Sequence, residues 1–332
     1  MDGRIGIGVI GVGVFGSEHA RVWSELEGAR LAGVADANPA RAEDMAARCR
    51  CRAFRDVREL VSSGDIRAVS VCTPDDAHVA PVVAALEAGK HVLVEKPFAT
   101  TVGDCDTMTG AAARAHRILT VGHILRFDPR YAVARAAVAK GDLGEIVHMR
   151  AMRQNNVASA DRMKARSTIM FFLGIHDLDF LNWCAGARLE RAYAESARRV
   201  LGDADDAFVS TLRYANGVVA SLEASWVLPR NYGTLEAGAE VVCAKGAVLV
   251  DGGFNDVRLA TSGPVSHLDH VYGPEIAGAS RGALRSQLEH FLASVRSGSA
   301  PLVTLAEARH AVEGICALTE SLRTGAPVLL GA

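Results

Sequence analysis

The sequence lacks most of what characterises membrane, secreted or nucleic-acid-binding proteins. No apolar run approaches the ~20 residues that a membrane-spanning helix needs, which argues against a membrane protein. The formal net charge of −2 provides no general attraction to nucleic acid or to an anionic lipid surface. The first residues, MDGRIGIGVI, include an acid and lead directly into a strand-like run, which does not resemble a secretion signal. We therefore expect a cytoplasmic protein.

Metal-binding and disulfide patterns are also missing. Seven cysteines is an odd number, and only Cys49 and Cys51 are close in sequence, without the paired spacing of a zinc site. His267 and His270 lie three residues apart, but a metal site there would need further ligands within reach. We therefore expect reduced thiols and no metal. Lysine is scarce as well, at five of the 36 basic residues, so composition alone does not account for Lys96 in VLVEKPF.

The chain has 332 residues, which is too long for one compact core. The spacing of its apolar runs changes along the sequence. The first third alternates Val- and Ile-rich runs with helical patterns, which is typical of a parallel sheet covered on both faces. With right-handed crossovers this becomes a doubly wound Rossmann sheet. The rhythm changes after Gly122. We therefore predict an α/β dinucleotide-binding Rossmann domain over residues 1–123.

The remainder, residues 124–332, is predicted to form an α+β domain for substrate binding and oligomerisation. Its strands mostly follow one another directly, which favours a large, open, mostly antiparallel sheet. We expect one helix at 175–186 between the strands and two closing helices at 281–297 and 304–324. The expected strands, after a first one that begins at Glu145, are 189–200, 206–214, 217–227, 233–243, 246–250 and 256–261.

A glycine motif joins the first strand to the first helix. In GVIGVGVFGSEHA, Gly11, Gly13 and Gly16 have GxGxxG spacing, and Asp36 ends the next strand 20 residues after Gly16. The first glycine permits the tight turn, the second admits a pyrophosphate, and the third lets the helix pack on the strand. The helix N-terminus attracts the phosphates. A tight turn that binds no ligand is the alternative. We expect the helix to be capped by Ser17 and to stop at Gly28.

Asp36 favours NAD over NADP, because a carboxylate accepts from both ribose hydroxyls and repels a 2′-phosphate. Arg41 is near enough in sequence to weaken that preference. The expected cofactor contacts are Gly11, Gly13, Val14, Phe15, Gly16, Asp36, Thr73, Pro74, His78, Glu95 and Lys96.

Glu95-Lys96-Pro97 ends one predicted strand and Thr73-Pro74 ends its neighbour. Both face the edge of the sheet where ligands of open parallel sheets bind. A lysine there can hold a substrate hydroxyl, stabilise an alkoxide or relay a proton. Pro97 is a candidate for a cis peptide bond, and Glu95 would balance or orient the lysine. A solvated Lys–Glu pair at the start of a loop is the alternative, and residue types alone leave both open.

These segments resemble the glucose–fructose oxidoreductase, inositol dehydrogenase and rhizopine catabolism (Gfo/Idh/MocA) family over essentially the whole chain. The resemblance lies in the order and spacing of GxGxxG, TPDDAH (73–78), EKP and GIHDLDFLNW (174–183). It implies a Rossmann domain, a second domain with an open sheet, and nicotinamide-dependent chemistry on a hydroxyl or carbonyl of a sugar or cyclitol. The catalytic lysine of the family falls on Lys96 and its catalytic histidine on His176.

One position departs from the family pattern. Members of the inositol dehydrogenase type often carry an aspartate four residues before the histidine, where this sequence has Phe172. An acid one helical turn away would polarise the histidine or hold the substrate, and this sequence lacks the aspartate of such an Asp–His pair. Asp179 either takes over the orienting role or caps the helix start. A catalytically silent NAD-binding regulator is therefore kept as an alternative.

Several other residues are candidates for binding, each with a structural alternative. His78 either contacts the nicotinamide ribose or begins a helix, and Arg126 either lines the pocket or forms an ion pair between domains. The basic stretch 155–166 either meets an anionic substrate or is a solvated face. The candidate substrate residues are His123, Arg126, Asn155, Arg162, Phe172, Asp179, Trp226 and Tyr232.

The sequence therefore predicts an NAD-dependent dehydrogenase or ketoreductase. Its substrate would be a secondary hydroxyl or keto group of a sugar, aminosugar, nucleotide sugar or cyclitol, with Lys96 and His176 as catalytic residues. An NADP-dependent reductase of a keto-sugar or diketone is the alternative within the enzyme class. A broad open sheet usually needs a partner, so we expect a homodimer or homotetramer that binds neither nucleic acid nor membrane.

Overall fold

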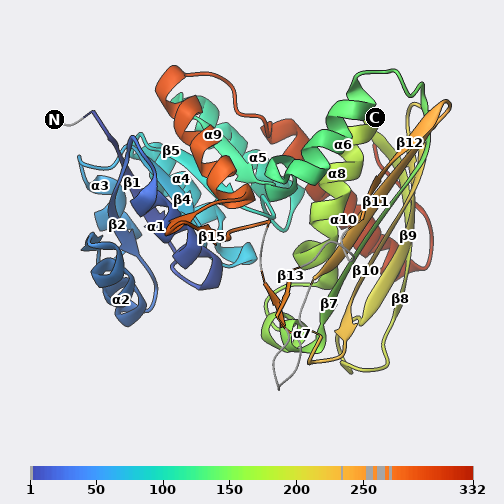
Figure 1. The fold of residues 1–332 in the computed structure, drawn as a ribbon, viewed down its shortest axis with the longest axis horizontal. Coiled ribbons are helices and arrows are strands. Elements are labelled where there is room, and N and C mark those ends of the chain that lie inside the picture. Colours follow the sequence, from blue (N-terminus) through green and yellow to red (C-terminus); the bar gives the residue numbers. More distant parts are fainter. Residues whose placement is uncertain (1–2, 233–234, 252–256, 260–265, 269–270, 332) are drawn as a thin grey trace. The chain divides into compact units, whose positions relative to one another are not determined.

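The chain divides into two compact units in the computed structural model, which describes all residues except 1–2, 233–234, 252–256, 260–265, 269–270 and 332 (Figure 1). The first unit comprises Met1–Phe127 and Val271–Arg309, and the second comprises Asp128–His270 and His310–Ala332. The sequence predicted a domain boundary after residue 123. It did not predict that residues 271–309 return to the first unit. Among the described helices, none is both long and apolar enough to cross a membrane.

The first unit contains a six-stranded parallel sheet in the order β3-β2-β1-β4-β5-β6. The direction of winding reverses between β1 and β4, which is the switch point where ligands bind in such sheets. The predicted doubly wound Rossmann sheet is confirmed. Its strands are β1 (Ile5–Ile10), β2 (Ala29–Ala35), β3 (Arg52–Ala53), β4 (Ala68–Val71), β5 (His91–Glu95) and β6 (Leu119–Gly122).

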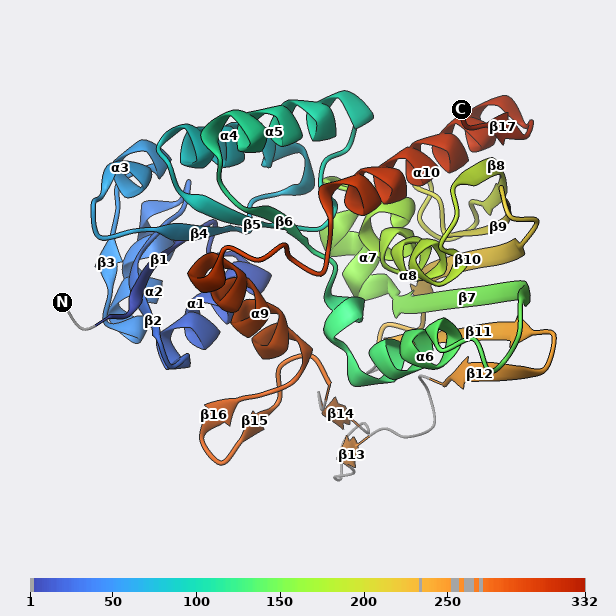
Figure 2. The ribbon, with the colours of Figure 1, turned by 90° about the horizontal axis from the view of Figure 1, so that it is seen from above.

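Helices cover both faces of this sheet. Figure 2 shows α3, α4 and α5 on one face and α1, α2 and α9 on the other. Leu288 and Phe291 of α9 are buried in one apolar cluster with Trp23 of α1 and Ile7 of β1. The apolar face of α9 thus completes this layer, which explains why the chain returns to the first unit. The helices are α1 (Val14–Glu25), α2 (Pro39–Cys49), α3 (Val57–Ser62), α4 (Val79–Glu87), α5 (Val102–Ala115) and α9 (Ala283–Ser297).

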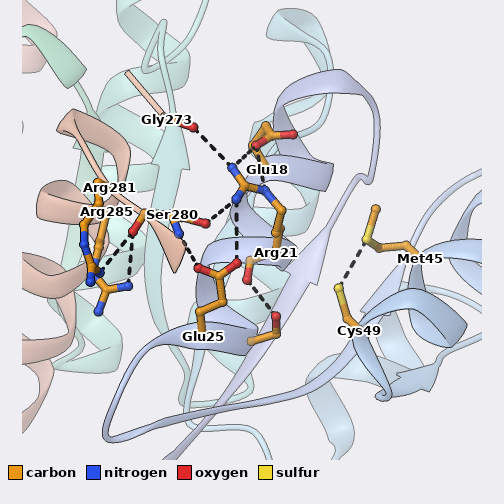
Figure 3. A network of polar contacts seen from close by, with 10 residues as sticks. Glu18, Arg21, Glu25, Met45, Cys49, Gly273, Ser280, Arg281 and Arg285 are labelled. Carbon is orange, nitrogen blue, oxygen red and sulfur yellow. Dashed lines mark hydrogen bonds and ion pairs between the residues drawn. The ribbon is translucent and has the colours of Figure 1, made fainter. Parts of the chain in front are cut away.

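The returning segment is also tied to α1 by polar contacts (Figure 3). Arg21 of α1 donates to the hydroxyl of Ser280 and to the carbonyl of Gly273, the latter at 3.4 Å. The backbone N–H of Ser280 donates to Glu25 at 2.7 Å. Ser280 is buried and ends a small hairpin formed by β15 (Glu275–Ile276) and β16 (Ala279–Ser280). Helix α1 is therefore held by the sheet on one side and by this hairpin on the other.

The predicted cap of α1 at Ser17 is wrong. The helix begins at Val14 with Gly13 as its N-cap, so Ser17 already lies in the second turn. Its hydroxyl donates to the carbonyl of Val12 at 3.0 Å. The helix ends at Glu25 rather than at Gly28, whose φ of +80° places it in the turn that leads into β2. Helix α1 therefore starts directly after Gly13, without a hydrogen bond from a capping side chain.

The second unit contains a seven-stranded sheet in the order β12-β11-β7-β10-β9-β8-β17. Only the pair of β7 and β10 is parallel among its pairings in the described residues, so the expected mostly antiparallel sheet is confirmed. The strands are β7 (Ile146–Asn156), β8 (Leu189–Ala197), β9 (Ala207–Tyr214), β10 (Val219–Leu228), β11 (Glu236–Cys243), β12 (Gly246–Val250) and β17 (Val328–Leu329). A separate short hairpin consists of β13 (Val257–Leu259) and β14 (Ser266–Leu268).

Helices α6, α8 and α10 lie on one face of this sheet (Figure 1). The side chains of Met149, Ala151 and Arg153 on β7 are all buried and alternate with more exposed neighbours. The basic stretch 155–166 contains helix α7, which Asn156 caps because its side-chain oxygen accepts from the backbone N–H of Ser159. The helices are α6 (Pro129–Ala139), α7 (Val157–Met163), α8 (Ile175–Ala185) and α10 (Leu305–Thr324).

Asp206 organises the loop between β8 and β9. Its buried carboxylate accepts from the backbone N–H groups of Arg199, Val200 and Leu201, at 2.7 Å and 2.9 Å for the last two. Burial by itself would raise the pKa of Asp206, but the three N–H donors favour the charged form, and the net result is a lowered pKa. The charged form of this side chain therefore stabilises the folded state.

We expect Asp206→Asn to lower the free energy of unfolding by about 1–3 kcal/mol at neutral pH, because the three donors lose their charged acceptor. The folded pKa lies below the unfolded value of about 3.9, so the stabilisation is present above that value and is lost as pH falls through the folded pKa. Urea denaturation of both proteins should give a difference that shrinks between pH 5 and pH 3. Asp203→Asn, at an exposed neighbouring position, is the control. A difference independent of pH would contradict the assignment.

Candidate functional site

The glycine turn after β1 has the geometry that a dinucleotide requires. Gly11 has a φ of +84°, and a Cβ there would lie 2.8 Å from the carbonyl oxygen of Cys72. A Cβ at Gly16 would lie 1.9 Å from the carbonyl oxygen of Gly11, so only glycine lets α1 pack this closely. A Cβ at Gly13 would meet nothing within 4 Å, which leaves the backbone there accessible to a ligand. The three glycines thus fit a pyrophosphate at the N-terminus of α1.

Asp36 lies beside this turn, at the end of β2. Its carboxylate accepts from the backbone N–H of Val12 at 2.8 Å and from that of Asn38 at 2.8 Å. These bonds hold a partly buried carboxylate at the carboxyl edge of the sheet, where the adenosine ribose of a dinucleotide binds. Arg41 is exposed in the first turn of α2. The residues present therefore fit a dinucleotide whose ribose carries free hydroxyls.

The residues after β4 form a local network. His78 is buried, and its ring nitrogens lie 2.9 Å from the carbonyl oxygen of Pro97 and 3.1 Å from that of Thr73. The hydroxyl of Thr73 donates to the carbonyl of Ala77 at 3.0 Å. A short helical turn, Asp75–Ala77, follows Pro74, and helix α4 begins directly after His78. Of the two roles considered for His78, these contacts favour the structural one, in which it ties the end of β4 to the segment after β5.

The EKP segment leaves β5 at the same edge of the sheet. The Lys96–Pro97 peptide bond is cis, as the sequence suggested. Glu95 is buried, and its carboxylate contacts His19 at 3.1 Å, Gln287 at 3.5 Å and the backbone N–H of Lys96 at 3.3 Å. Lys96 itself is partly exposed. This segment is therefore not a solvated Lys–Glu pair, because the carboxylate is inside the protein.

His123 and Arg126 follow β6 and are both buried. Arg126 pairs with Glu307 at 3.1 Å and donates to the carbonyl of Leu302 at 3.4 Å. Both partners belong to the first unit, so these contacts favour an ion pair within that unit over a role in binding substrate.

His176 is the second residue of α8 and is partly exposed. A π-helical turn, Met170–Gly174, comes directly before α8, and such turns are frequent at functional sites. Phe172 in this turn packs on Trp226 at a centroid distance of 6.2 Å. Trp226 is 1% exposed and donates to the carbonyl of Asp205 at 2.7 Å, so it lies in the core. At the position where an acid would assist His176, the structure therefore has an aromatic contact between Phe172 and Trp226.

Arg153 and Asp177 form a buried ion pair beside His176, and Arg153 is not among the site residues predicted from the sequence. The two distances between the guanidinium and the carboxylate are 2.6 Å and 2.9 Å. Burial raises the pKa of the Asp177 carboxyl, and the charge and hydrogen bonds of Arg153 offset part of that effect. The pair joins the residue next to His176 to β7, an interior strand of the sheet. The sequence signal that points to Arg153 is a charged residue at a buried position of a strand whose positions alternate between buried and exposed.

Three other substrate candidates of the second unit bond residues close to them in the chain. Asn155 accepts from the backbone N–H of Asn156 at 2.8 Å, and the hydroxyl of Tyr232 bonds Glu236. Arg162 is exposed on α7 and donates to Ser159 at 3.4 Å.

The basic stretch 155–166 is partly neutralised. Lys164 and Arg230 both pair with Asp161, at 3.7 Å and 2.5 Å. Asp179 is buried on α8. In the described parts of the chain, no three histidine, cysteine, aspartate or glutamate side chains gather as metal ligands would.

Arg153→Ala should lower the free energy of unfolding by about 3–5 kcal/mol, because Asp177 would be left buried without its cation. Chemical denaturation measures this value. Arg198→Ala is the matched control, since Arg198 is 57% exposed in its ion pair with Asp205 and should change stability little. Equal effects of the two substitutions would contradict a buried anchoring pair.

Comparison with known proteins identifies both parts of the chain. Residues 5–123 match the family described as "Oxidoreductase family, NAD-binding Rossmann fold", and residues 131–249 match the GFO/IDH/MocA C-terminal domain. The scyllo-inositol 2-dehydrogenase (NAD(+)) of Bacillus subtilis is 28% identical over 99% of this chain and 97% of its own. The UDP-N-acetylglucosamine 3-dehydrogenase of Acidithiobacillus ferrooxidans is 36% identical over 67% of each chain.

A solved structure shares the fold over nearly the whole length. The crystal structure of GenD2 from gentamicin A biosynthesis in complex with NAD superimposes with a TM-score of 0.88 over 99% of this chain and 97% of that one, at 24% identity. At that identity the likeness concerns the fold alone. Together with the two family matches, these findings show that the chain belongs to the Gfo/Idh/MocA family of oxidoreductases and that its first unit carries the NAD-binding Rossmann fold of that family.

Proposed function

We propose that this oxidoreductase is an NAD-dependent dehydrogenase whose substrate is a secondary hydroxyl of a cyclitol, sugar, aminosugar or nucleotide sugar. The observation that carries the proposal is the glycine turn with Asp36 hydrogen-bonded to it, at the sheet edge from which Lys96 emerges. The named activities of the two relatives, on scyllo-inositol and on UDP-N-acetylglucosamine, support this substrate class. The first unit would bind the dinucleotide, and the second would bind the substrate.

The two catalytic residues would divide the work on one oxygen atom. When bound, NAD supplies the hydride acceptor. His176 removes the proton of the substrate hydroxyl, and Lys96 hydrogen-bonds the same oxygen and stabilises the charge that develops on it. Acid–base assistance of this kind contributes roughly 10²–10⁴ to the rate. In the reductive direction His176 returns the proton to the alkoxide.

The exposed face of the seven-stranded sheet supports a homodimer or homotetramer. Val209, Val219 and Leu249 are 56%, 41% and 69% exposed, and the strand register places them on the face away from α6 and α8. A second copy would cover these side chains. The free thiols of all seven cysteines support a cytoplasmic location.

A silent NAD-binding regulator is the second candidate, and Phe172 is the observation that favours it. Its ring packs on Trp226 and offers His176 no acid one turn before it. NAD binding without turnover of any polyol, cyclitol or nucleotide sugar would favour this candidate over the enzyme.

Asp36→Asn should raise the affinity for NADP relative to NAD by at least about tenfold. The amide keeps the shape of the side chain and removes the charge that repels a 2′-phosphate. Fluorescence titration of both coenzymes measures the ratio, with the exposed Asp44→Asn on α2 as control. A wild-type protein that binds both coenzymes equally would contradict the role of Asp36.

Lys96→Met and His176→Ala should each lower kcat at least about tenfold, because each removes a group that acts on the reacting oxygen. The assay is NADH formation with a panel of cyclitols, polyols and nucleotide sugars. NAD should still bind both variants, which titration tests separately. Wild-type turnover in both variants would remove the catalytic assignment.

A further inference from the structure

A buried polar cluster surrounds Glu95, the residue before Lys96. Its other two members, His19 and Gln287, belong to neither the glycine motif nor the EKP motif. His19 of α1, Glu95 of β5 and Gln287 of α9 are 0%, 7% and 2% exposed. They come from three elements separated by 76 and 192 residues in the chain, all within the first unit. The fold therefore brings distant polar side chains to the end of one strand.

The carboxylate of Glu95 is the centre of this cluster. Its Oε1 lies 3.1 Å from His19 Nε2 and accepts from Gln287 Nε2 at 3.5 Å. Its Oε2 accepts from the backbone N–H of Lys96 at 3.3 Å. A Cβ at Gly122, on the neighbouring strand, would lie 2.4 Å from Oε1, so this glycine leaves the space that the carboxylate occupies. One oxygen thus faces the two helices, and the other faces the backbone of Lys96.

Filling the core does not explain such a cluster. A buried carboxylate costs free energy unless it is well paired, and apolar residues of similar volume are often as stable or more stable. Two further atoms of the cluster, His19 Nδ1 and Gln287 Oε1, are buried without a hydrogen-bond partner among the described residues. Unsatisfied buried groups of this kind call for an explanation other than stability.

The cluster also contacts the coenzyme turn. Phe15, between Gly13 and Gly16, packs edge-on against the ring of His19 at a centroid distance of 5.2 Å. Helix α1 therefore carries the glycine turn at its first residues and His19 in its second turn. Any shift of this helix would move both.

We propose that His19, assisted by Gln287, is a positioning residue for Lys96. His19 holds the carboxylate of Glu95, and Glu95 holds the backbone N–H of Lys96, so the lysine is aligned by the same helix that binds the coenzyme phosphates. The inference rests on the proposed function of Lys96 and extends the site to α1 and α9. His19 does not touch the substrate and acts only through Glu95.

The test compares His19→Ala with the conservative His19→Gln, whose amide keeps a donor for Glu95. His19→Ala should lower kcat by about 10- to 100-fold, as expected for a catalytic group that loses its alignment, while the Kd for NAD stays within about threefold. His19→Gln should restore kcat to within about fivefold of the wild type. His91→Gln is the matched control, because His91 begins the same strand and contacts the backbone N–H of Ile118 at the opposite end.

A second measurement does not depend on turnover. Acylation of Lys96, followed by mass spectrometry and compared with the exposed Lys140, reports how firmly its side chain is held. His19→Ala should speed the modification of Lys96 at least about threefold relative to Lys140, and His19→Gln should reverse this.

The outcomes separate the two proposals. Faster modification in His19→Ala without turnover in any variant would leave the positioning role standing and remove the proposed function. Unchanged modification of Lys96 in His19→Ala would overturn the positioning role. A loss of kcat that His19→Gln fails to restore, with lowered thermal stability in both variants, would show a merely structural role and overturn it too.

Discussion

The close packing of helix α1 on strand β1 is the constraint on which the rest of the site depends. At Gly16 the helix approaches the carbonyl of Gly11 so closely that no side chain fits between them. This contact directs the N-terminus of α1 to the carboxyl edge of the sheet, where its free N–H groups favour an anion. It also brings His19, one turn further along the helix, to the end of β5. Coenzyme binding and the placement of Lys96 thus have a common origin.

Each unit contains one buried carboxylate next to a residue proposed to be catalytic. Glu95 precedes Lys96 and is held by His19, whereas Asp177 follows His176 and is held by Arg153. In both cases the partner comes from a different element of secondary structure. A carboxylate fixed in this way restricts the backbone of the residue beside it, which is what preorganisation of a catalytic side chain requires. The resemblance between the two arrangements suits a site whose groups must be aligned to within about 1 Å.

Much of the fold was predictable because buried parallel strands appear in the sequence as short, nearly continuous apolar runs. β1, β4 and β5 consist mostly of buried apolar residues, and Asp36 and the EKP segment come where such strands end. The start of α1 was misplaced because Ser17 looks like a cap, while the true cap, Gly13, bonds the helix through its backbone alone. The return of α9 to the first unit was missed because an amphipathic pattern shows that a face is apolar and does not show which layer it joins.

The polar partners behind the site were harder to predict than the site residues themselves. Arg153 and Gln287 have no motif, and their importance comes from burial against residues far away in the chain. His19 lies within the segment GVIGVGVFGSEHA, yet its contact with Glu95 depends on how the helix turns after Gly16. Trp226 was expected among the residues that bind substrate, but its indole donates to a loop carbonyl and is buried. Pairings of this kind are properties of the tertiary structure.

The most direct test of the proposed catalytic site is a crystal structure of the protein with NADH and an unreactive substrate analogue. We expect Lys96 Nζ and His176 Nε2 both to lie within about 2.6–3.2 Å of one oxygen of the analogue, beside the nicotinamide ring. A structure in which either nitrogen points away from that oxygen, with no water joining them, would contradict it.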